Sequence, residues 1–190
     1  MALVQVTAPT SEPVSLADAK LHVGVATDDS DAYIASLVKA AREWAETYTR
    51  RSMLTTTWRQ TLSCWPSDGV IELHRPPLQS VTSVTYYDTD GDSTTLATSH
   101  TDSEPGRVLR GYGITWPALR TDGVAAPATV TYIAGHSAAA SVPGSTIHAI
   151  KMLVGHWFEN REEIITGAVA TKIPMAARAL LSGVSHGSYP

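Results

Sequence analysis

Residues 31–50 of this chain read DAYIASLVKAAREWAETYTR, and their pattern decides the fold. Apolar and aromatic side chains recur there with the i, i+3, i+4, i+7 spacing of an α-helix that buries one face. The members of this stripe are Ile34, Leu37, Val38, Ala41, Trp44, Ala45 and Tyr48. Because an amphipathic helix draws most of its stability from packing against another element, the pattern predicts a second helix as its partner.

That partner is predicted at residues 145–163, which read STIHAIKMLVGHWFENREE. Its apolar stripe consists of Ile147, Ile150, Val154, Trp157 and Phe158. The spacing is again that of a helix with one buried face. We therefore expect the two long helices to pack against each other.

Two shorter helices are expected beside the long pair. One spans residues 16–23, where Ser15 and Asp18 resemble a capping box and Gly24 suits a left-handed end. The other spans residues 174–181, because a proline is favoured in the first turn of a helix.

The chain between the long helices changes to β-branched, aromatic and turn-forming residues. Strands are predicted over residues 53–64, 70–73, 81–87, 94–96, 108–110 and 130–133. Asp90 and Gly91 predict a hairpin turn between the third and the fourth of these strands. The predicted fold class is therefore α+β. A helical platform of residues 1–51 and 143–190 carries an inserted antiparallel β subdomain of residues 52–142.

Composition limits the possible functions. The chain has 190 residues and a net charge of −4 at pH 7, without a run of Lys or Arg, which disfavours tight binding to nucleic-acid phosphates. Cys64 is the only cysteine, so no intramolecular disulfide can form and a cysteine-based zinc site is not expected. The N-terminus lacks the pattern of a signal peptide, and no apolar run reaches the roughly 20 residues that a membrane span needs. We expect a soluble chain made in a reducing compartment.

One loop imitates a serine hydrolase. Residues 135–139 read GHSAA and follow a predicted strand, as in the nucleophile elbow of an α/β-hydrolase, although Ala139 replaces the second glycine. No Asp follows Ser137, so Glu159 and His186 would have to complete the triad. The pattern favours a plain surface loop, and a small serine hydrolase that uses Ser137 is kept as an alternative function.

Two further patterns resemble metal sites without completing one. The acids of residues 88–92 surround Gly91, but this glycine falls at the wrong position for a calcium loop and no helices flank it. His156 and Glu159 lie one helical turn apart and lack an obvious third ligand. A polar hairpin tip and a structural histidine explain these patterns better. We predict no catalytic residue, no metal and no cofactor.

Several short stretches, in one order along nearly the whole chain, carry a further signal. They are residues 13–20 (PVSLADAK), 28–29 (DD), 40–43 (AARE), 55–58 (TTTW), 75–78 (RPPL), 81–84 (VTSV), 155–162 (GHWFENRE), 173–174 (IP) and 180–181 (LL). As an ordered set they resemble the head–tail connector, or adaptor, family of tailed phages and of related gene-transfer agents. One departure lies at the end of the first long helix. This end often reads Thr-Gly-Arg in the family and is Thr49-Arg50-Arg51 here, so the helix either runs on or caps differently.

The resemblance implies a non-enzymatic structural protein of the virion neck, made in the host cytoplasm. Such proteins form a homo-oligomeric ring, typically a dodecamer, below the portal protein. The ring extends the DNA channel and docks a stopper or tail-completion protein, and genomic DNA passes through it without sequence-specific binding. No membrane is involved. Another neck or tail-completion structural protein on the same scaffold is a second alternative.

Candidate contact residues follow from the helices and from the resemblance. Aromatic residues and arginine are enriched in interface cores. Such residues lie near the ends of the two long helices, which are therefore the candidate contact regions. The candidates for contacts between copies are Trp44, Tyr48, Trp157, Phe158, Arg161 and Glu162. The C-terminal segment is assigned to the portal and is expected to become ordered only on binding. The candidates there are Pro174, Arg178, Leu180, Leu181 and Tyr189.

Overall fold

The structure is a computed structural model of the chain. It describes residues 1–96, 100–102, 106–110, 113, 115–160 and 174–186. The chain divides into two compact units. The strand unit comprises residues 1–10 and 55–136, and the helical unit comprises residues 11–54 and 137–190. The predicted α+β class, with a helical part and antiparallel sheets, is confirmed.

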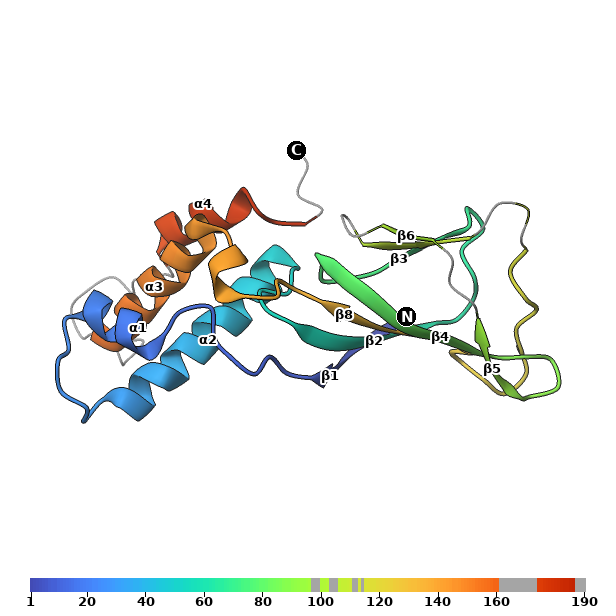
Figure 1. Ribbon diagram of the computed structural model, residues 1–190, viewed down its shortest axis with the longest axis horizontal. Helices are drawn as coiled ribbons and strands as arrows, with labels where there is room; N and C mark the ends of the chain where they lie inside the picture. Colours follow the sequence, from blue (N-terminus) through green and yellow to red (C-terminus); the bar gives the residue numbers. More distant parts are fainter. Residues whose placement is uncertain (97–99, 103–105, 111–112, 114, 161–173, 187–190) are drawn as a thin grey trace, which may run out of the picture. The chain divides into compact units, whose positions relative to one another are not determined.

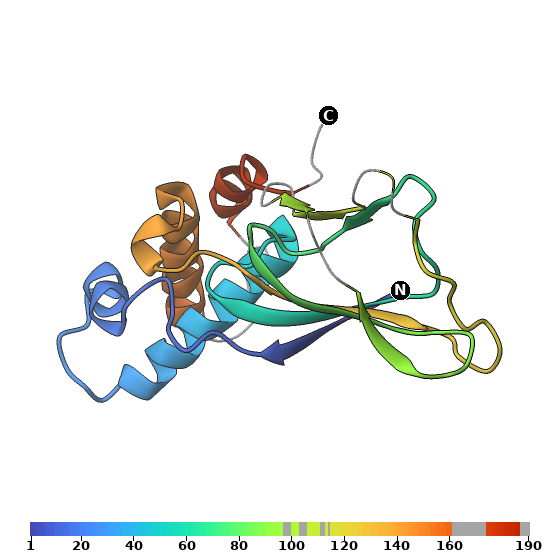
Figure 2. The same cartoon turned by 45° about the vertical axis from the view of Figure 1, so that its right-hand side comes forward.

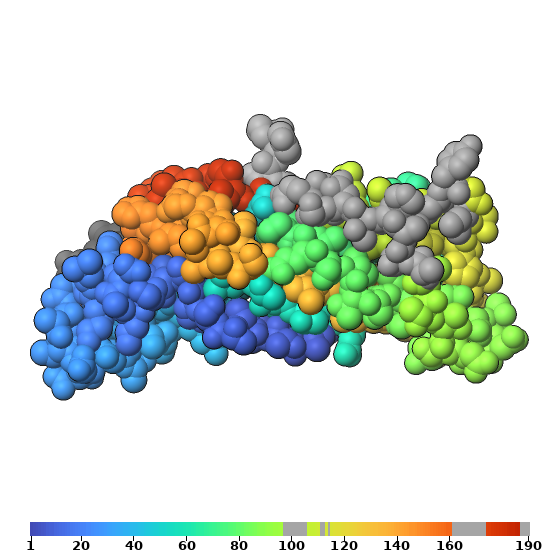
Figure 3. Space-filling view, in the orientation of Figure 1, coloured from blue at the N-terminus to red at the C-terminus, as the bar shows by residue number. Residues whose placement is uncertain are grey.

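The helical unit is a bundle of four helices around one core (Figure 1). The helices are α1 (Leu16–Val23), α2 (Asp31–Thr49), α3 (Gly144–Glu159) and α4 (Met175–Ser182), with a short 3₁₀ helix, η1 (Ala139–Ser141), ahead of α3. The two long helices pack against each other as predicted, and α1 and α4 each contact both of them. In the space-filling view the blue surface of α1 meets the orange surface of the α3 segment (Figure 3). Ile34, Ile150 and Leu153 lie in the core without exposed surface.

Local sequence sets the ends of the helices. Ser15 caps α1 by accepting a hydrogen bond from the Asp18 N–H at 3.1 Å, and its hydroxyl donates to the Asp18 carboxylate at 2.7 Å. Gly24 ends α1 in the left-handed conformation, with φ 71°. Arg50 takes the same conformation after Thr49, with φ 55° and ψ 31°. Helix α2 therefore does not run on, because an arginine supplies the cap at a conformational cost of about 1 kcal/mol.

The strand unit contains two antiparallel sheets (Figures 1 and 2). The larger sheet has the order β1 (Ala2–Thr7), β2 (Thr56–Leu62), β8 (Ala128–Ala134), β4 (Leu78–Tyr87) and β5 (Ser93–Leu96). The smaller sheet has the order β3 (Val70–Glu72), β7 (Arg107–Leu109) and β6 (His100–Asp102). Every described strand pair is antiparallel, although α1 and α2 lie between β1 and β2 in the chain.

A second core lies between the two sheets. Along β8 the alternate residues Val130 and Tyr132 are fully buried, and they pack with Ile71 and Val108 of the smaller sheet. The intervening β8 residues point to the opposite side of the larger sheet, which we call the open face. The open face is represented below by Val4, Arg59, Thr85, Tyr87, Thr129 and Thr131, which share it by strand register.

Two buried polar side chains fasten the segment after β3 to the larger sheet. Gln60 donates from Nε2 to the carbonyl of Glu72 at 2.8 Å and accepts the His74 N–H at 3.1 Å. The Tyr132 hydroxyl donates to the His74 carbonyl at 2.7 Å. Burial raises the pKa of the Tyr132 hydroxyl above its usual value, and it outweighs the opposing effects of Arg75 and of the hydrogen bond to His74. The sheets are thus joined by directed hydrogen bonds as well as by apolar contact.

Strands β1 and β6 were not predicted. Residues 1–10, which the sequence analysis grouped with the helices, belong to the strand unit, because β1 pairs with β2 from Ala2 opposite Thr61 to Thr7 opposite Thr57. A short strand at a sheet edge is stabilised by its partner rather than by its own propensity, so its sequence carries little signal. Within the described ranges, no helix is both long enough and apolar enough to cross a bilayer.

Candidate interaction surfaces

The first predicted aromatic pair lies on α2. The rings of Trp44 and Tyr48 stack at 5.2 Å between centroids with 13° between their planes. Their i, i+4 spacing places both rings on one side of the helix. Trp44 packs against the core of the helical unit, whereas Tyr48 is 38% exposed. The phenol of Tyr48 is therefore the part of this pair that another molecule can reach.

The second predicted pair holds α3 on α2. Trp157 and Phe158 are half-buried, and the Phe158 ring lies 6.0 Å from the ring of Tyr33 at the start of α2. The Tyr33 hydroxyl donates to the Trp157 carbonyl at 3.4 Å, so the two long helices run antiparallel. Sequence reasoning missed Tyr33, because its role depends on which end of α3 reaches it.

The predicted interface residues do not form one cluster. Tyr33 and Tyr48 are separated along α2 by 15 residues, which corresponds to about 22 Å at the helical rise of roughly 1.5 Å per residue. Trp157 and Phe158 lie near Tyr33, whereas Trp44 stacks on Tyr48. Arg161 and Glu162 lie outside the described residues.

Helix α4 presents one face to the core and one to solvent. Ala177 and Leu181, spaced i, i+4, are fully buried, and Leu180 is partly buried against the same core. Arg178 is exposed, and Met175, three residues earlier, is 85% exposed. Of the predicted docking residues, Arg178 thus lies on the outer face. Met175 lies on the same face and was not predicted. Leu181 supports the helix from within the core.

The remaining docking candidates lie at the two ends of α4. Pro174 occupies the position before the first helical residue and is half-buried, and Tyr189 lies outside the described residues. In the isolated chain α4 is already a helix packed on α3 and α2. The expectation that the segment becomes ordered only on binding stays a prediction.

A buried ionic cluster, which the sequence analysis did not identify, ties the helical unit together. Arg42 donates from Nε to Glu12 at 2.7 Å and from Nη1 to Glu46 at 2.8 Å, and Glu46 also accepts the N–H of Met53 at 2.8 Å. Burial disfavours the charged guanidinium, but the bonds to Glu12 and Glu46 outweigh burial and raise the pKa of Arg42. The cluster joins the segment before α1, helix α2 and the segment after α2.

A second set of charges fixes the connection between α1 and α2. The ammonium of Lys20 lies 2.7 Å from carboxylate oxygens of both Asp28 and Asp31. Hydrogen bonds to these two acids raise the pKa of Lys20, and the hydrogen bond from Lys20 lowers the pKa of Asp28. The acidic residues before α2 therefore have a structural partner.

The geometry around Ser137 is not that of a nucleophile elbow. Strand β8 ends at Ala134 and α3 begins at Gly144, so no tight strand–turn–helix junction presents the serine. Ser137 lies in an exposed loop, and Glu159 is exposed at the far end of α3. The hydrolase alternative therefore lacks the architecture that it needs.

The two metal-like patterns also have structural explanations. The Asp88 carboxylate accepts the N–H groups of Asp90 at 3.0 Å and Asp92 at 2.9 Å, which closes the β4–β5 turn. The ring of His156 contacts the side-chain amide of Asn160 at 3.4 Å. No group of three or more His, Cys, Asp or Glu side chains suited to a metal ion occurs in the part of the chain that the structure describes.

Comparison with known families gives a match over the first half of the chain. Residues 13–103 match the family described as "Phage gp6-like head-tail connector protein". The span runs from the segment before α1 to the region of β6. This match confirms the resemblance predicted from the sequence. No curated protein matches the chain.

Solved structures share the fold along the whole chain. One is described as "Virion of native gene transfer agent (GTA) particle", with a TM-score of 0.80, 22% identity and coverage of 100% of this chain and 98% of that chain. "Neck of empty GTA particle computed with C6 symmetry" has a TM-score of 0.80, 21% identity and full coverage of both chains. "Neck of native GTA particle computed with C12 symmetry" has a TM-score of 0.78, 22% identity and the same coverage. At this level of identity the likeness establishes the fold.

Proposed function

We propose, from the match of residues 13–103 to the phage gp6-like head–tail connector family, that this chain is a structural protein in the neck of a tailed phage or of a gene-transfer-agent particle. It forms a homo-oligomeric ring below the portal protein, extends the DNA channel and docks the stopper or tail-completion protein. One observation carries the proposal. The family match coincides with a likeness of the complete chain to chains from GTA necks, at TM-scores of 0.80 and 0.78.

The ring is supported by the symmetry of those necks and by the surfaces of the helical unit. The two similar neck structures were computed with C6 and C12 symmetry. Each copy in a ring contacts its two neighbours through two different surfaces. Tyr48 is exposed at one end of α2 and serves as a contact between copies, whereas Trp157 and Phe158 hold α3 on α2 within one copy. Arg161 and Glu162 stay candidates for the contact between copies.

The charge of the chain suits a DNA channel. Its net charge is −4, with 14 Lys and Arg against 18 Asp and Glu. Tight binding to DNA requires clustered cations that neutralise several phosphates. A ring of mildly acidic chains has few such contacts, so genomic DNA slides through it without sequence-specific binding.

The outer face of α4 is the portal-docking surface in this proposal. Met175 and Arg178 are exposed on one side of the helix, and Ala177 and Leu181 hold the opposite side in the core. A methionine adapts to irregular apolar surfaces, and an arginine binds carboxylates with paired hydrogen bonds. Pro174 and Leu180 position this face, and Tyr189 stays a candidate for the portal contact.

Portal binding tests this surface directly. We expect the double variant Met175→Ser, Arg178→Ser to bind purified portal rings roughly tenfold or more weakly, as for the loss of interface anchors. The matched control is Leu21→Ser on α1, where Leu21 is 82% exposed, and its binding should equal that of the wild type. Unchanged binding by the double variant would remove the α4 assignment.

The position of the chain in the particle tests the function itself. We expect a tag on this chain to appear in negative-stain images as a ring directly below the portal. A tag on the tail side of the neck would make the chain a tail-completion or another neck protein. Particles that lack the chain would rule out the proposed function.

A further inference from the structure

The larger sheet is almost free of charged residues. Its five strands contain one charged residue, Arg59 in β2. The whole chain has 32 charged residues, which are 14 Lys and Arg and 18 Asp and Glu. The side of an antiparallel sheet that faces water ordinarily carries polar and charged side chains. Depletion of Asp, Glu and Lys is instead the composition of a protein interface core.

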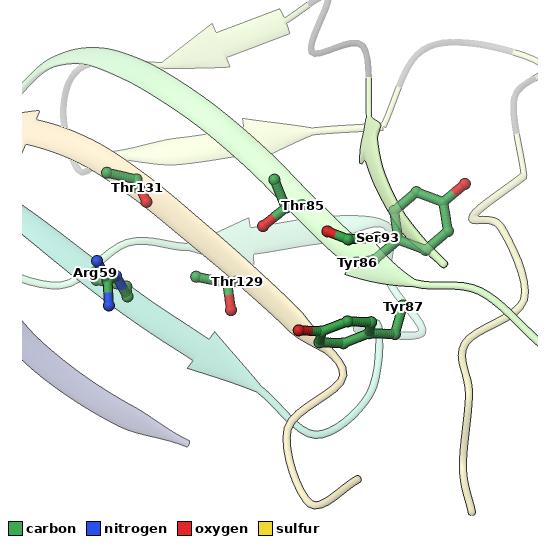
Figure 4. A pocket seen from close by; sticks show the side chains of 7 residues that line it. All are labelled: Arg59, Thr85, Tyr86, Tyr87, Ser93, Thr129 and Thr131. Carbon is green, nitrogen blue, oxygen red and sulfur yellow. The ribbon is translucent and has the colours of Figure 1, made fainter. Parts of the chain in front are cut away.

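Strand register places Arg59 among hydroxyl groups on the open face. Arg59 is opposite Thr131 of β8 and opposite Val4 of β1, and Thr85 of β4 is opposite Thr129 of β8. A pocket of about 300 Å³ on this face is lined by Arg59, Thr85, Tyr86, Tyr87, Ser93, Thr129 and Thr131. Figure 4 shows these side chains coming from four neighbouring strands, with the Tyr87 ring reaching toward Thr129.

The guanidinium of Arg59 has no partner among the described residues. Arg59 is exposed, and its side chain makes no hydrogen bond or ion pair to any residue that the structure describes. Three other arginines of the chain, Arg42, Arg107 and Arg120, lie within 4.0 Å of a carboxylate. A guanidinium offers five N–H donors in a planar fork that matches a carboxylate. Since none of the five strands contains an acid, a carboxylate must come from elsewhere.

Two exposed side chains with apolar surface share the open face with Arg59. Val4 on β1 lies opposite Arg59, and Tyr87 lies at the end of β4, two strands away from β2. Arginine and tyrosine are residue types that are enriched in interface hot spots. The surrounding threonine hydroxyls supply further hydrogen-bond donors without adding charge.

We infer that the open face receives a neighbouring copy of this chain, and that Arg59 binds an Asp or Glu side chain of that copy. The inference rests on the proposed function, which places copies side by side. A heterologous ring contact joins two different surfaces, so an acid-free face with one arginine complements an acidic face of the next copy. The chain supplies such acids in excess, with 18 Asp and Glu against 14 Lys and Arg.

Photo-crosslinking identifies the occupant. A benzoylphenylalanine in place of Thr131, next to Arg59, is incorporated into the full chain, and assembled particles are irradiated and digested. We expect adducts that join two copies of this chain, with residue 131 linked to a peptide that contains Asp or Glu. An adduct to a different protein, or no adduct from labelled chain present in the particles, overturns the inference. Absence of the chain from the particles instead refutes the proposed function.

Competition for assembly tests the role of the charge. Arg59→Ala, produced together with the wild-type chain, should be underrepresented in particles by roughly tenfold or more, as for an interface hot spot. The share of Arg59→Lys in particles should lie between those of Arg59→Ala and of the wild type, because an ammonium is a point charge that cannot form the paired hydrogen bonds of a guanidinium. The matched control is Arg107→Ala on β7, a partly exposed arginine that lies 4.0 Å from Glu72.

Folding of the variants is measured separately. Arg59 contacts no partner among the described residues of its own chain, so the urea midpoint of Arg59→Ala should equal that of the wild type. An unchanged midpoint with poor assembly supports the docking role. Assembly of Arg59→Ala at the wild-type level overturns it.

Discussion

Replacing Arg42 by alanine tests whether the buried ionic cluster holds the helical unit together. The Arg42 side chain is 4% exposed and that of Glu46 is 10% exposed, and the two lie 2.8 Å apart. Without the guanidinium, the Glu46 carboxylate loses its 2.8 Å ion pair with Arg42, while the N–H of Met53 still donates to it. Glu12 is nearer to water, so its lost bond costs less. Breaking one side of a buried pair costs about 3–5 kcal/mol, and we expect Arg42→Ala to lower the free energy of unfolding by this amount.

Urea unfolding followed by tryptophan fluorescence measures this loss. Trp44 and Trp157 lie in the helical unit and report on it. With a denaturant slope of about 1–3 kcal/mol/M, the midpoint should fall by about 1–5 M. The matched control is Glu43→Ala. Glu43 is exposed and its nearest contact to Arg42 is 3.6 Å, so the expected loss is about 0–1 kcal/mol.

Arg42→Lys adds a graded test. A lysine ammonium cannot reproduce the fork that reaches Glu12 and Glu46 at once, so the loss should lie between those of the control and of Arg42→Ala. The reasoning is refuted if Arg42→Ala unfolds within about 1 kcal/mol of the wild type, since removing one partner of a buried ion pair costs more than that.

Three further substitutions test local features, each by the urea midpoint. Arg50→Gly should raise the free energy of unfolding by about 1 kcal/mol, because glycine adopts the left-handed cap at φ 55° without steric cost. Gly91→Ala should lower it by about 1–2 kcal/mol, because this residue has φ 93° and a Cβ would lie 2.5 Å from the Arg120 guanidinium, whose flexible end can move aside. Tyr132→Phe should lower it by about 1–2 kcal/mol at pH 8, since the His74 carbonyl loses its 2.7 Å hydrogen bond. Because the pKa of Tyr132 is raised above the unfolded value of about 10, the wild type loses stability as the pH rises above 10, and its advantage over Tyr132→Phe should shrink at pH 11.

Each of these has an outcome that contradicts it. A lower midpoint for Arg50→Gly would mean that the arginine side chain stabilises the helix end by more than its backbone costs. A wild-type midpoint for Gly91→Ala would show that the turn relaxes freely. A constant difference between wild type and Tyr132→Phe from pH 8 to pH 11 would show that the tyrosine does not titrate differently in the two states.

The sequence alone located the helices well, because helices depend on local rules. Ser15, Asp18 and Gly24 set the ends of α1 through hydrogen bonds and backbone conformation within a few residues, and α1 spans the predicted residues 16–23. The stripe on residues 31–50 likewise predicted α2 to within one residue of its end. The strands of residues 2–7 and 100–102 were missed, since short strands depend on their pairing partners, and the partner of the first is 50 or more residues away.

The candidate surfaces show the same division. Helical periodicity places Ala177 and Leu181 on one side of α4 and Met175 with Arg178 on another. Only the packing of α4 against α3 shows that Ala177 and Leu181 face the core. The burial of Arg42 had no local signal, because its partner Glu12 is 30 residues away. Arg59 stood out only once the sheet register showed that its neighbours carry no charge.

By itself the amino-acid sequence determined the helices, their buried stripes and caps, and the family match. These properties arise from residue spacing, backbone propensity and ordered motifs, which are all encoded within short stretches. The tertiary structure decided which strands pair, which charges are buried and which side chains remain exposed. Those properties depend on contacts between residues far apart in the chain, and such contacts exist only once the chain has folded.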